Sequence, residues 1–207
     1  MSQKIILLSG KKGSGKDTLA DFLKPHFSRA SFADPLYQEV QEAYLLDSQN
    51  LLRDRVSKET PSSELCLKYC RDLEFVSVML AKGVKMDTPL SPRVVLQNWG
   101  TDYRQAKDGA NYWVDKLIDL VKARPFEDFC IPDMRFPHEY TGLLEYSWDS
   151  NADLVCVKII REGGVVADEA SSHISENALE GFDIFDLTIT NSEGSPELMA
   201  EQFWQKV

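Results

Sequence analysis

The chain has 207 residues, of which 43% are hydrophobic, and its formal net charge at pH 7 is −10. A chain of this length can bury a substantial core and is most simply one domain spanning residues 1–207. The acidic balance argues against a partner that is a nucleic-acid polymer or a membrane surface, so an anionic ligand must meet locally focused positive charge. The sequence shows no signal peptide, lipidation motif, membrane-spanning stretch or CxxC pair, so a cytoplasmic location is expected, in the host if the protein is viral.

Short β-like runs alternate along the chain with longer segments of helical periodicity. Strands are expected at residues 4–8, 28–32, 129–131, 154–160 and 187–190. Helices are expected at residues 18–27, 35–46, 63–80, 92–98, 112–123, 137–147, 172–179 and 196–204. The alternation predicts an α/β fold in which a mostly parallel five-stranded sheet is flanked by helices.

Two segments are longer than simple connections require. The one between the second and third strands predicts a helical insertion over residues 37–125, which in a nucleotide enzyme would build the acceptor pocket. After the fourth strand, Arg161 precedes two glycines, a pattern that suits a lid over residues 161–175 closing on phosphates. The alternative for that segment is a mobile connection in which Ser172 caps a helix.

The segment 9–18, with the sequence SGKKGSGKDT, lies between the first strand and the first helix. Gly10, Gly15 and Lys16 have the spacing of a phosphate-binding loop, in which backbone N–H groups and a lysine hold the phosphates of a nucleotide. Asp17 stands where that motif has serine or threonine, and an aspartate there can hold Mg²⁺ or cap the helix. The alternative is a glycine-containing turn with exposed lysines and no ligand.

The segment 92–104 places two arginines, an amide, aromatic rings and a hydroxyl close together in the sequence. Arginine can hold a phosphate, Gln97 can recognise a base edge, and Trp99 or Tyr103 can stack on the base. The alternative is an amphipathic helix with its apolar residues in the core and its arginines in water, and composition alone favours this alternative.

Polar residues also follow the third and fifth predicted strands. In an open parallel sheet, ligands lie beyond the carboxyl ends of the strands, so Asp133 and Arg135 would face the same crevice as the phosphate loop. Asp133 could order Mg²⁺ or orient the acceptor, or it could only cap a turn, and Arg135 could only pair with Glu139. Asn191 could contact an adenine ring, although turn formation alone also explains it.

Taken in order, these segments resemble the deoxynucleoside monophosphate kinases of large tailed bacteriophages. The resemblance is carried by residues 9–18, Phe32-Ala33-Asp34-Pro35-Leu36, Arg93 with Leu96-Gln97, Gly100-Thr101-Asp102, Tyr112-Trp113-Val114, residues 133–139 and His173-Ile174-Ser175-Glu176. It implies the P-loop kinase fold, ATP and Mg²⁺ as cosubstrates, and transfer of the γ-phosphate to a deoxynucleoside monophosphate. It also implies a homodimer, and the expected partners are otherwise the two small-molecule substrates.

The motifs and the resemblance together assign site residues. The expected ATP-binding residues are Gly10, Lys12, Gly13, Ser14, Gly15, Lys16, Asp17, Thr18 and Asn191. The expected acceptor-binding residues are Asp34, Arg93, Gln97, Trp99, Gly100, Thr101, Asp102, Arg104 and Trp113. The expected catalytic residues are Lys16, Asp133, Arg135 and Arg161, with Asp17 and Asp133 as metal ligands.

Three other functions remain open from the sequence. The chain could be a P-loop kinase for phosphomevalonate, dephospho-coenzyme A or a sugar acid. It could be a nucleotide-dependent hydrolase or switch without an acceptor, although no Asn-Lys-x-Asp or Asp-x-x-Gly element is present. It could also be an inactive nucleotide-binding protein, because Asp17 replaces the usual hydroxyl ligand.

Overall fold

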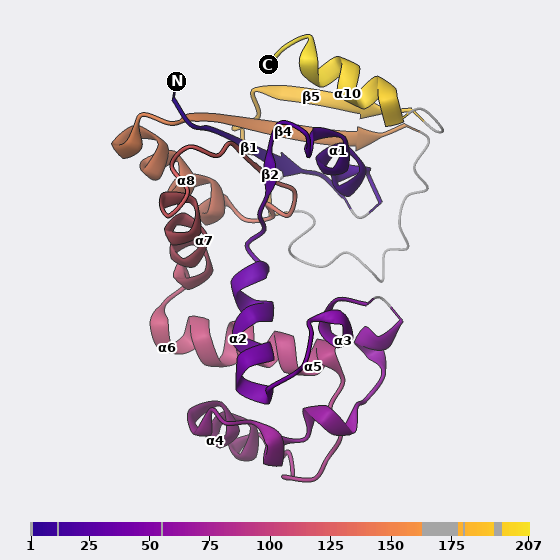
Figure 1. The fold of residues 1–207 in the computed structure, drawn as a ribbon, viewed down its shortest axis with the longest axis vertical. Coiled ribbons are helices and arrows are strands. Elements are labelled where there is room, and N and C mark those ends of the chain that lie inside the picture. Colours follow the sequence, from indigo (N-terminus) through magenta and orange to yellow (C-terminus); the bar gives the residue numbers. More distant parts are fainter. Residues whose placement is uncertain (1, 12, 55, 163–177, 180, 193–195) are drawn as a thin grey trace. The chain divides into compact units, whose positions relative to one another are not determined.

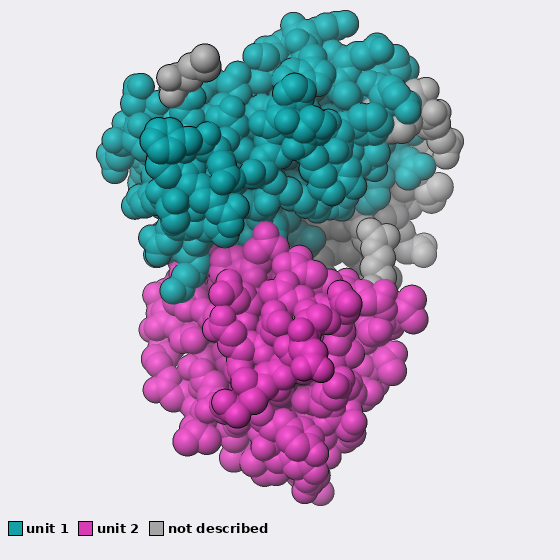
Figure 2. All heavy atoms as spheres, viewed as in Figure 1, with its two compact units in different colours: residues 1–32, 114–207 teal, residues 33–113 magenta. Residues whose placement is uncertain are grey.

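The computed structural model describes residues 2–11, 13–54, 56–162, 178–179, 181–192 and 196–207 (Figure 1). The chain divides into two compact units, of which unit 1 comprises residues 1–32 and 114–207 and unit 2 comprises residues 33–113 (Figure 2). Unit 2 overlaps most of the helical insertion predicted at 37–125, but it begins four residues earlier, and residues 114–125 belong to unit 1. The prediction of a single domain over 1–207 stays a prediction.

Unit 1 contains a five-stranded sheet with the order β2-β3-β1-β4-β5. The strands are β1 (Lys4–Ser9), β2 (Ser28–Arg29), β3 (Phe129–Ile131), β4 (Asp153–Arg161) and β5 (Leu187–Asn191). Every pair of neighbouring strands is parallel, and the central strand β1 pairs with β3 on one side and β4 on the other. The predicted α/β fold with a parallel five-stranded sheet is confirmed, and it is consistent with the P-loop kinase fold.

Helices cover both faces of this sheet (Figure 1). Successive side chains of β1 point to opposite faces, so both faces carry apolar residues that must be buried. Unit 1 helices are α1 (Lys16–Leu23), α7 (Tyr112–Lys122, from residue 114 on), α8 (Pro137–Ser150) and α10 (Pro196–Trp204). Ile5 and Leu7 pack with apolar residues of α7 and α8, whereas Ile6 and Leu8 pack with those of α1 and α10. All four side chains are fully buried, so both layers of the core meet at the strand that leads into the phosphate loop.

Unit 2 is helical and has a separate core. Its elements are α2 (Asp34–Tyr44), α3 (Asn50–Arg53), η1 (Ser57–Glu59), η2 (Ser63–Leu65), η3 (Leu67–Tyr69), α4 (Leu73–Ala81), α5 (Pro92–Gln97), η4 (Asn98–Gln105) and α6 (Ala106–Asp108). The core includes Val40, Leu52, Phe75, Val95 and Trp99, which come from α2 to η4. These residues bury apolar surface within unit 2 itself.

The helix predicted at 63–80 is wrong in its first half. Cys66 and Cys70 have extended backbone, which limits this stretch to two short 3₁₀ turns. The α-helix begins only after Asp72, whose carboxylate accepts hydrogen bonds from the backbone N–H groups of Glu74 and Phe75. Apolar spacing alone did not reveal these breaks, because the aspartate cap sits inside the predicted helix.

Other differences lie at element ends. The second strand is confined to Ser28–Arg29, whereas residues up to 32 were predicted as strand. The predicted helix at 172–179 and the lid at 161–175 lie outside the described residues, apart from their ends. In the described part of the chain, no helix combines the length and the apolar character needed to cross a membrane.

Candidate functional site

The candidate phosphate loop, called the phosphate loop below, joins β1 to α1, where the sequence placed it. Gly10, Gly13 and Gly15 have φ values of 154°, 77° and 105°, and Gly15 is the N-cap residue of α1. Positive φ values are accessible to glycine at little cost and allow successive N–H groups to turn toward one point. The predicted strand, loop and helix arrangement is confirmed, and its glycines have the backbone conformation that a phosphate cradle requires.

Gly10 has a second reason to lack a side chain. A Cβ atom on Gly10 would lie 2.4 Å from the carbonyl oxygen of Ile159 in β4, which cannot move without disturbing the sheet. We expect Gly10→Ala to lower the free energy of unfolding by about 2–4 kcal/mol, because overpacking adds to the φ strain. Urea denaturation measures this loss.

Gly83→Ala is the matched control for Gly10→Ala. Gly83 also has a positive φ, of 83°, but a Cβ atom there meets nothing within 4 Å. Gly83→Ala should therefore lower the free energy of unfolding only by the conformational strain, about 1 kcal/mol. Equal losses in the two variants would show that the approach of Gly10 to Ile159 carries no energetic weight.

Two cationic side chains donate hydrogen bonds to carbonyl groups of the phosphate loop. The Lys16 ammonium donates hydrogen bonds to the carbonyls of Gly10 at 2.5 Å and Lys11 at 2.9 Å. Arg161, at the end of β4, donates from Nη1 to the carbonyl of Gly13 at 3.3 Å. The donor set of two cations and backbone N–H groups fits the phosphates of a nucleotide. The predicted ATP ligand Lys12 lies outside the described residues.

Asn191 supports the same loop from β5. Its side-chain Nδ2 donates to the carbonyl of Ser14 at 2.8 Å, and a Cβ atom on Gly15 would lie 2.5 Å from that nitrogen. Asn191 therefore fixes the loop backbone just before α1. Its expected contact with adenine stays a prediction, and the loop contact was missed because these residues lie far apart in the sequence.

Asp17, in the first turn of α1, forms an ion pair with Arg29 of β2. Arg29 also donates to Asp21 at 3.3 Å, so two carboxylates of α1 hold one guanidinium. Although burial disfavours the charged form, the hydrogen bond to Asp17 raises the pKa of Arg29. Thr18, the next predicted ATP ligand, is exposed on the same turn.

The two predicted metal ligands, Asp17 and Asp133, fit Mg²⁺ only together with substrate phosphates. Among the described residues, no group of three or more His, Cys, Asp or Glu side chains could hold a metal ion. Mg²⁺ is usually bound by one or two carboxylates, water and substrate phosphates, and a site of that kind does not need a larger cluster. The assignment of Asp17 and Asp133 as metal ligands stays a prediction.

Asp133 follows β3, the direct neighbour of β1. Because the two strands are parallel, Asp133 lies beyond the same edge of the sheet as the phosphate loop, as predicted. Its Oδ1 accepts a hydrogen bond from the backbone N–H of Phe32 at 3.1 Å. Arg135, two residues later, is exposed. The structure therefore places both predicted residues on one short segment at this edge.

Sequence reasoning did not assign Glu139 to the site. Its side chain lies in the first turn of α8, only 8% of the residue is exposed, and Oε2 accepts hydrogen bonds from the backbone N–H groups of Arg135 at 2.6 Å and Phe136 at 2.9 Å. The contact with Arg135 is thus to its backbone rather than to the side chain. Glu139 fixes the segment that carries Asp133, and its spacing from Phe136 is that of a capping box.

Burial raises the pKa of Glu139 to about 7, against the lowering effect of the two backbone hydrogen bonds. Because the folded-state pKa is above the unfolded one, the stability that this group contributes is fully present below pH 4.5 and is lost as the pH rises through about 7. We expect the free energy of unfolding of the wild type, relative to Glu139→Gln, to fall by a few kcal/mol between about pH 5 and pH 8. Urea denaturation across this range would contradict the prediction if the difference were constant.

Most predicted acceptor residues lie on two consecutive elements of unit 2. Arg93 and Gln97 are exposed on α5, and Trp99, Gly100, Thr101, Asp102 and Arg104 lie on η4, which is a π-helix. Such helices occur frequently at functional sites. The predicted helix ending at 98 therefore continues, in wider form, through the whole candidate segment.

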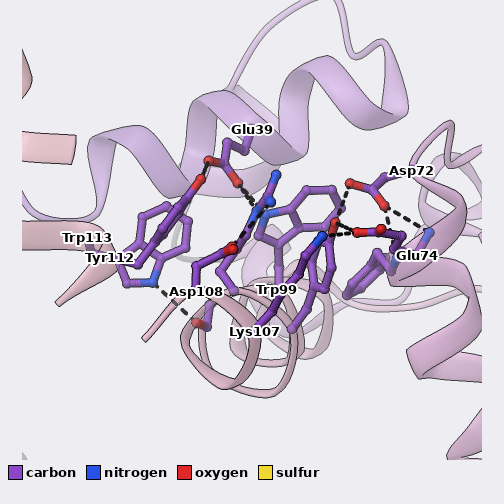
Figure 3. Close-up of polar contacts among 12 residues, drawn as sticks. Glu39, Asp72, Glu74, Trp99, Lys107, Asp108, Tyr112 and Trp113 are labelled. Carbon is purple, nitrogen blue, oxygen red and sulfur yellow. Dashed lines mark hydrogen bonds and ion pairs between the residues drawn. The ribbon is translucent and has the colours of Figure 1, made fainter. Parts of the chain in front are cut away.

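Glu39 of α2 is the centre of the polar contacts in this segment (Figure 3). Its carboxylate accepts hydrogen bonds from Arg104 Nε at 2.7 Å, from Trp99 Nε1 at 2.9 Å and from the hydroxyl of Tyr112. The guanidinium carbon of Arg104 also lies 4.7 Å from the centre of the Tyr103 ring. Trp99 and Arg104 are therefore held by protein groups, and Glu39 was not identified from the sequence.

The remaining predicted acceptor residues have separate partners. Trp113 Nε1 donates to the carbonyl of Gly100 at 3.2 Å. Three others form ion pairs: Asp102 with Lys82 at 2.6 Å, Arg93 with Glu59, and Asp34 with Arg53 at 2.6 Å. The structure thus distributes these residues over several contacts of unit 2 and does not gather them around one side chain.

Comparison with known proteins gives one relative over almost the full length. No family model matches the chain. A protein of Acanthamoeba polyphaga mimivirus, named "Putative deoxynucleotide monophosphate kinase", is 28% identical over 210 residues, covering 95% of this chain and 93% of the relative. The crystal structure of an unliganded sugar kinase from Janibacter sp. HTCC2649 aligns with 99% of this chain and 94% of its own, with 13% identity and a TM-score of 0.48.

The mimivirus relative supports a kinase-type enzyme. It comes from a giant virus, so the bacteriophage part of the expected resemblance stays a prediction. The match agrees with the ordered motifs, which also extend over nearly the whole chain. The predicted resemblance is therefore confirmed: across nearly its entire length, this chain is similar to a protein named "Putative deoxynucleotide monophosphate kinase".

Proposed function

We propose that this protein is a deoxynucleoside monophosphate kinase, which transfers the γ-phosphate of ATP to a deoxynucleoside monophosphate and releases ADP. The observation that carries the proposal is the phosphate loop, in which left-handed glycines lead into α1 and Lys16 and Arg161 both contact the loop. The full-length similarity to the mimivirus relative supports the choice of acceptor.

The residues of unit 1 supply what phosphoryl transfer needs most, which is in-line placement and charge neutralisation. Lys16 and Arg161 stabilise negative charge on the phosphates, and Arg135 adds a cation from the neighbouring strand end. Asp17 and Asp133 are the proposed ligands of Mg²⁺, which neutralises phosphate charge when bound. The acceptor phosphate is already anionic near neutral pH, so no side chain is required as a general base.

A coupled assay of ADP release tests the proposal. The protein is incubated with ATP and Mg²⁺ and with dTMP, dGMP, dCMP, dAMP, their ribose counterparts or no acceptor. We expect release that depends on a deoxynucleoside monophosphate and disappears when Mg²⁺ is removed with EDTA.

Each contrary outcome points to a different function. Release that does not depend on an acceptor would indicate a hydrolase or switch. Release with phosphomevalonate, dephospho-coenzyme A or a sugar acid, but not with deoxynucleotides, would indicate another P-loop kinase. ATP binding without any release would indicate an inactive nucleotide-binding protein.

A further inference from the structure

Two cations lie near the ring of Tyr37, on α2 in unit 2. The guanidinium carbon of Arg53, from α3, lies 4.2 Å from the centre of this ring. The ammonium of Lys58, from η1, lies 5.4 Å from the same centre and donates a hydrogen bond to the Tyr37 hydroxyl at 3.0 Å. The two cations therefore share one aromatic side chain.

The anionic partners of this group are few. Arg53 donates from Nη2 to Asp34 at 2.6 Å and from Nε to Gln49 at 2.7 Å, and its Nη1 has no hydrogen bond within the part of the chain that the structure describes. In that same part, Lys58 has no ion pair with a carboxylate. Hydrogen-bonding capacity thus remains on both cations.

A third cation lies on the neighbouring element. Arg93 of α5 pairs with Glu59, the residue that follows Lys58 in η1. Arg53, Lys58 and Arg93 are therefore accompanied by two paired carboxylates, those of Asp34 and Glu59. The three cations outnumber the two carboxylates that pair with them, in a chain whose net charge is −10, and locally focused positive charge attracts anionic ligands.

The arrangement has an energetic cost that an anion would remove. Two like charges beside one ring repel each other, and a cation–π contact at an exposed site is weak. A phosphate dianion has enough acceptor oxygens for both a hydrogen bond from the Nη1 of Arg53 and an ion pair with the ammonium of Lys58. The two cations would then share one anion as well as one ring.

We propose that Arg53, Lys58 and the hydroxyl of Tyr37 bind the phosphate monoester of the acceptor nucleotide, an inference that rests on the proposed function. The acceptor is favoured over ATP because the phosphate loop belongs to unit 1, whereas this cluster lies in unit 2. Two residues that the sequence assigned to the acceptor, Asp34 and Arg93, belong to it. Asp34 holds the guanidinium of Arg53 in place for the phosphate.

Kinetics with the variants Arg53→Gln and Lys58→Gln test the inference. Each variant is expected to raise the KM for the deoxynucleoside monophosphate at least about 10-fold, because a charge-assisted hydrogen bond contributes about 1.5 kcal/mol or more. The KM for ATP should stay within about 2-fold. Lys68→Gln is the matched control, because Lys68 is an exposed lysine of unit 2 that pairs with Asp87, and it should leave both constants unchanged.

A binding measurement separates phosphate recognition from a general effect on the fold. Isothermal titration calorimetry compares the affinity for the deoxynucleoside monophosphate with that for the same deoxynucleoside without phosphate. The wild type should prefer the phosphorylated form, and Arg53→Gln should lose most of this preference while its Tm stays close to that of the wild type.

The outcomes distinguish the two proposals. If the wild type transfers phosphate but Arg53→Gln and Lys58→Gln keep the wild-type KM and the preference for the phosphorylated form, the inference is overturned and the proposed function stands. If the wild type shows no transfer to any deoxynucleoside monophosphate, the proposed function fails and the inference fails with it.

Discussion

Replacing Lys16 by methionine is expected to reduce turnover by about 100-fold or more while the fold stays intact. Removing one preorganised donor to developing charge typically costs this much, and the lysine of a phosphate loop is such a donor. The side chain contacts loop carbonyls rather than the core, and methionine keeps a similar apolar stem. Steady-state kinetics with ATP and the best acceptor measure the loss.

Lys24→Met provides the control for Lys16→Met. Lys24 follows α1, is exposed and pairs with Asp21 three residues away, so its removal should change neither turnover nor stability appreciably. Circular dichroism and thermal denaturation should show that both variants remain folded. Turnover by Lys16→Met at the wild-type rate would overturn the assignment of this loop as the phosphate-binding site.

The parts of the structure that depend on local pattern were predictable. The run Ile5–Leu8, followed by glycines at fixed spacing, indicated a buried strand and a phosphate loop, and the strand and the positive φ values of the glycines are present. The parallel order of the strands then placed Asp133 beyond the same sheet edge as that loop. Each of these steps uses residues close in sequence or a general rule for parallel sheets.

The partners of the candidate residues were not predictable in the same way. Asp17 is held by Arg29, and Trp99 and Arg104 by Glu39, a residue of a different helix. No local spacing relates α2 to η4, because their contact arises only when unit 2 forms its own core. A single sequence does not distinguish an exposed arginine from one that is paired with a partly buried carboxylate.

The pair of Glu39 and Arg104 gives a large expected effect on the stability of unit 2. Their side chains are 18% and 21% exposed, so solvent screens the ion pair only weakly. Arg104→Ala leaves the Glu39 carboxylate with its hydrogen bonds from Trp99 and Tyr112 but without a counterion. Removing one partner of a buried ion pair costs about 3–5 kcal/mol, and we expect about 2–4 kcal/mol here because some solvent reaches the pair.

Lys107→Ala is the control for Arg104→Ala, because it removes a cation from the next element of the same unit. Lys107 pairs with Glu74, but their side chains are 47% and 64% exposed, and such surface pairs contribute about 0–1 kcal/mol. Urea denaturation should therefore separate the two variants clearly. Equal stability losses would show that the contact between Glu39 and Arg104 does not hold unit 2 together.

A double-mutant cycle with Glu39→Gln shows how much of the loss belongs to the pair itself. If Arg104 acts mainly by neutralising Glu39, then Arg104→Ala should cost at least about 1 kcal/mol less when Glu39 is already glutamine. Kinetics of the same variants test the acceptor role predicted from the sequence. An Arg104→Ala variant that raises the KM for the monophosphate far more than that for ATP would show that this arginine serves the substrate as well, whereas equal effects would leave Arg104 with its structural role alone.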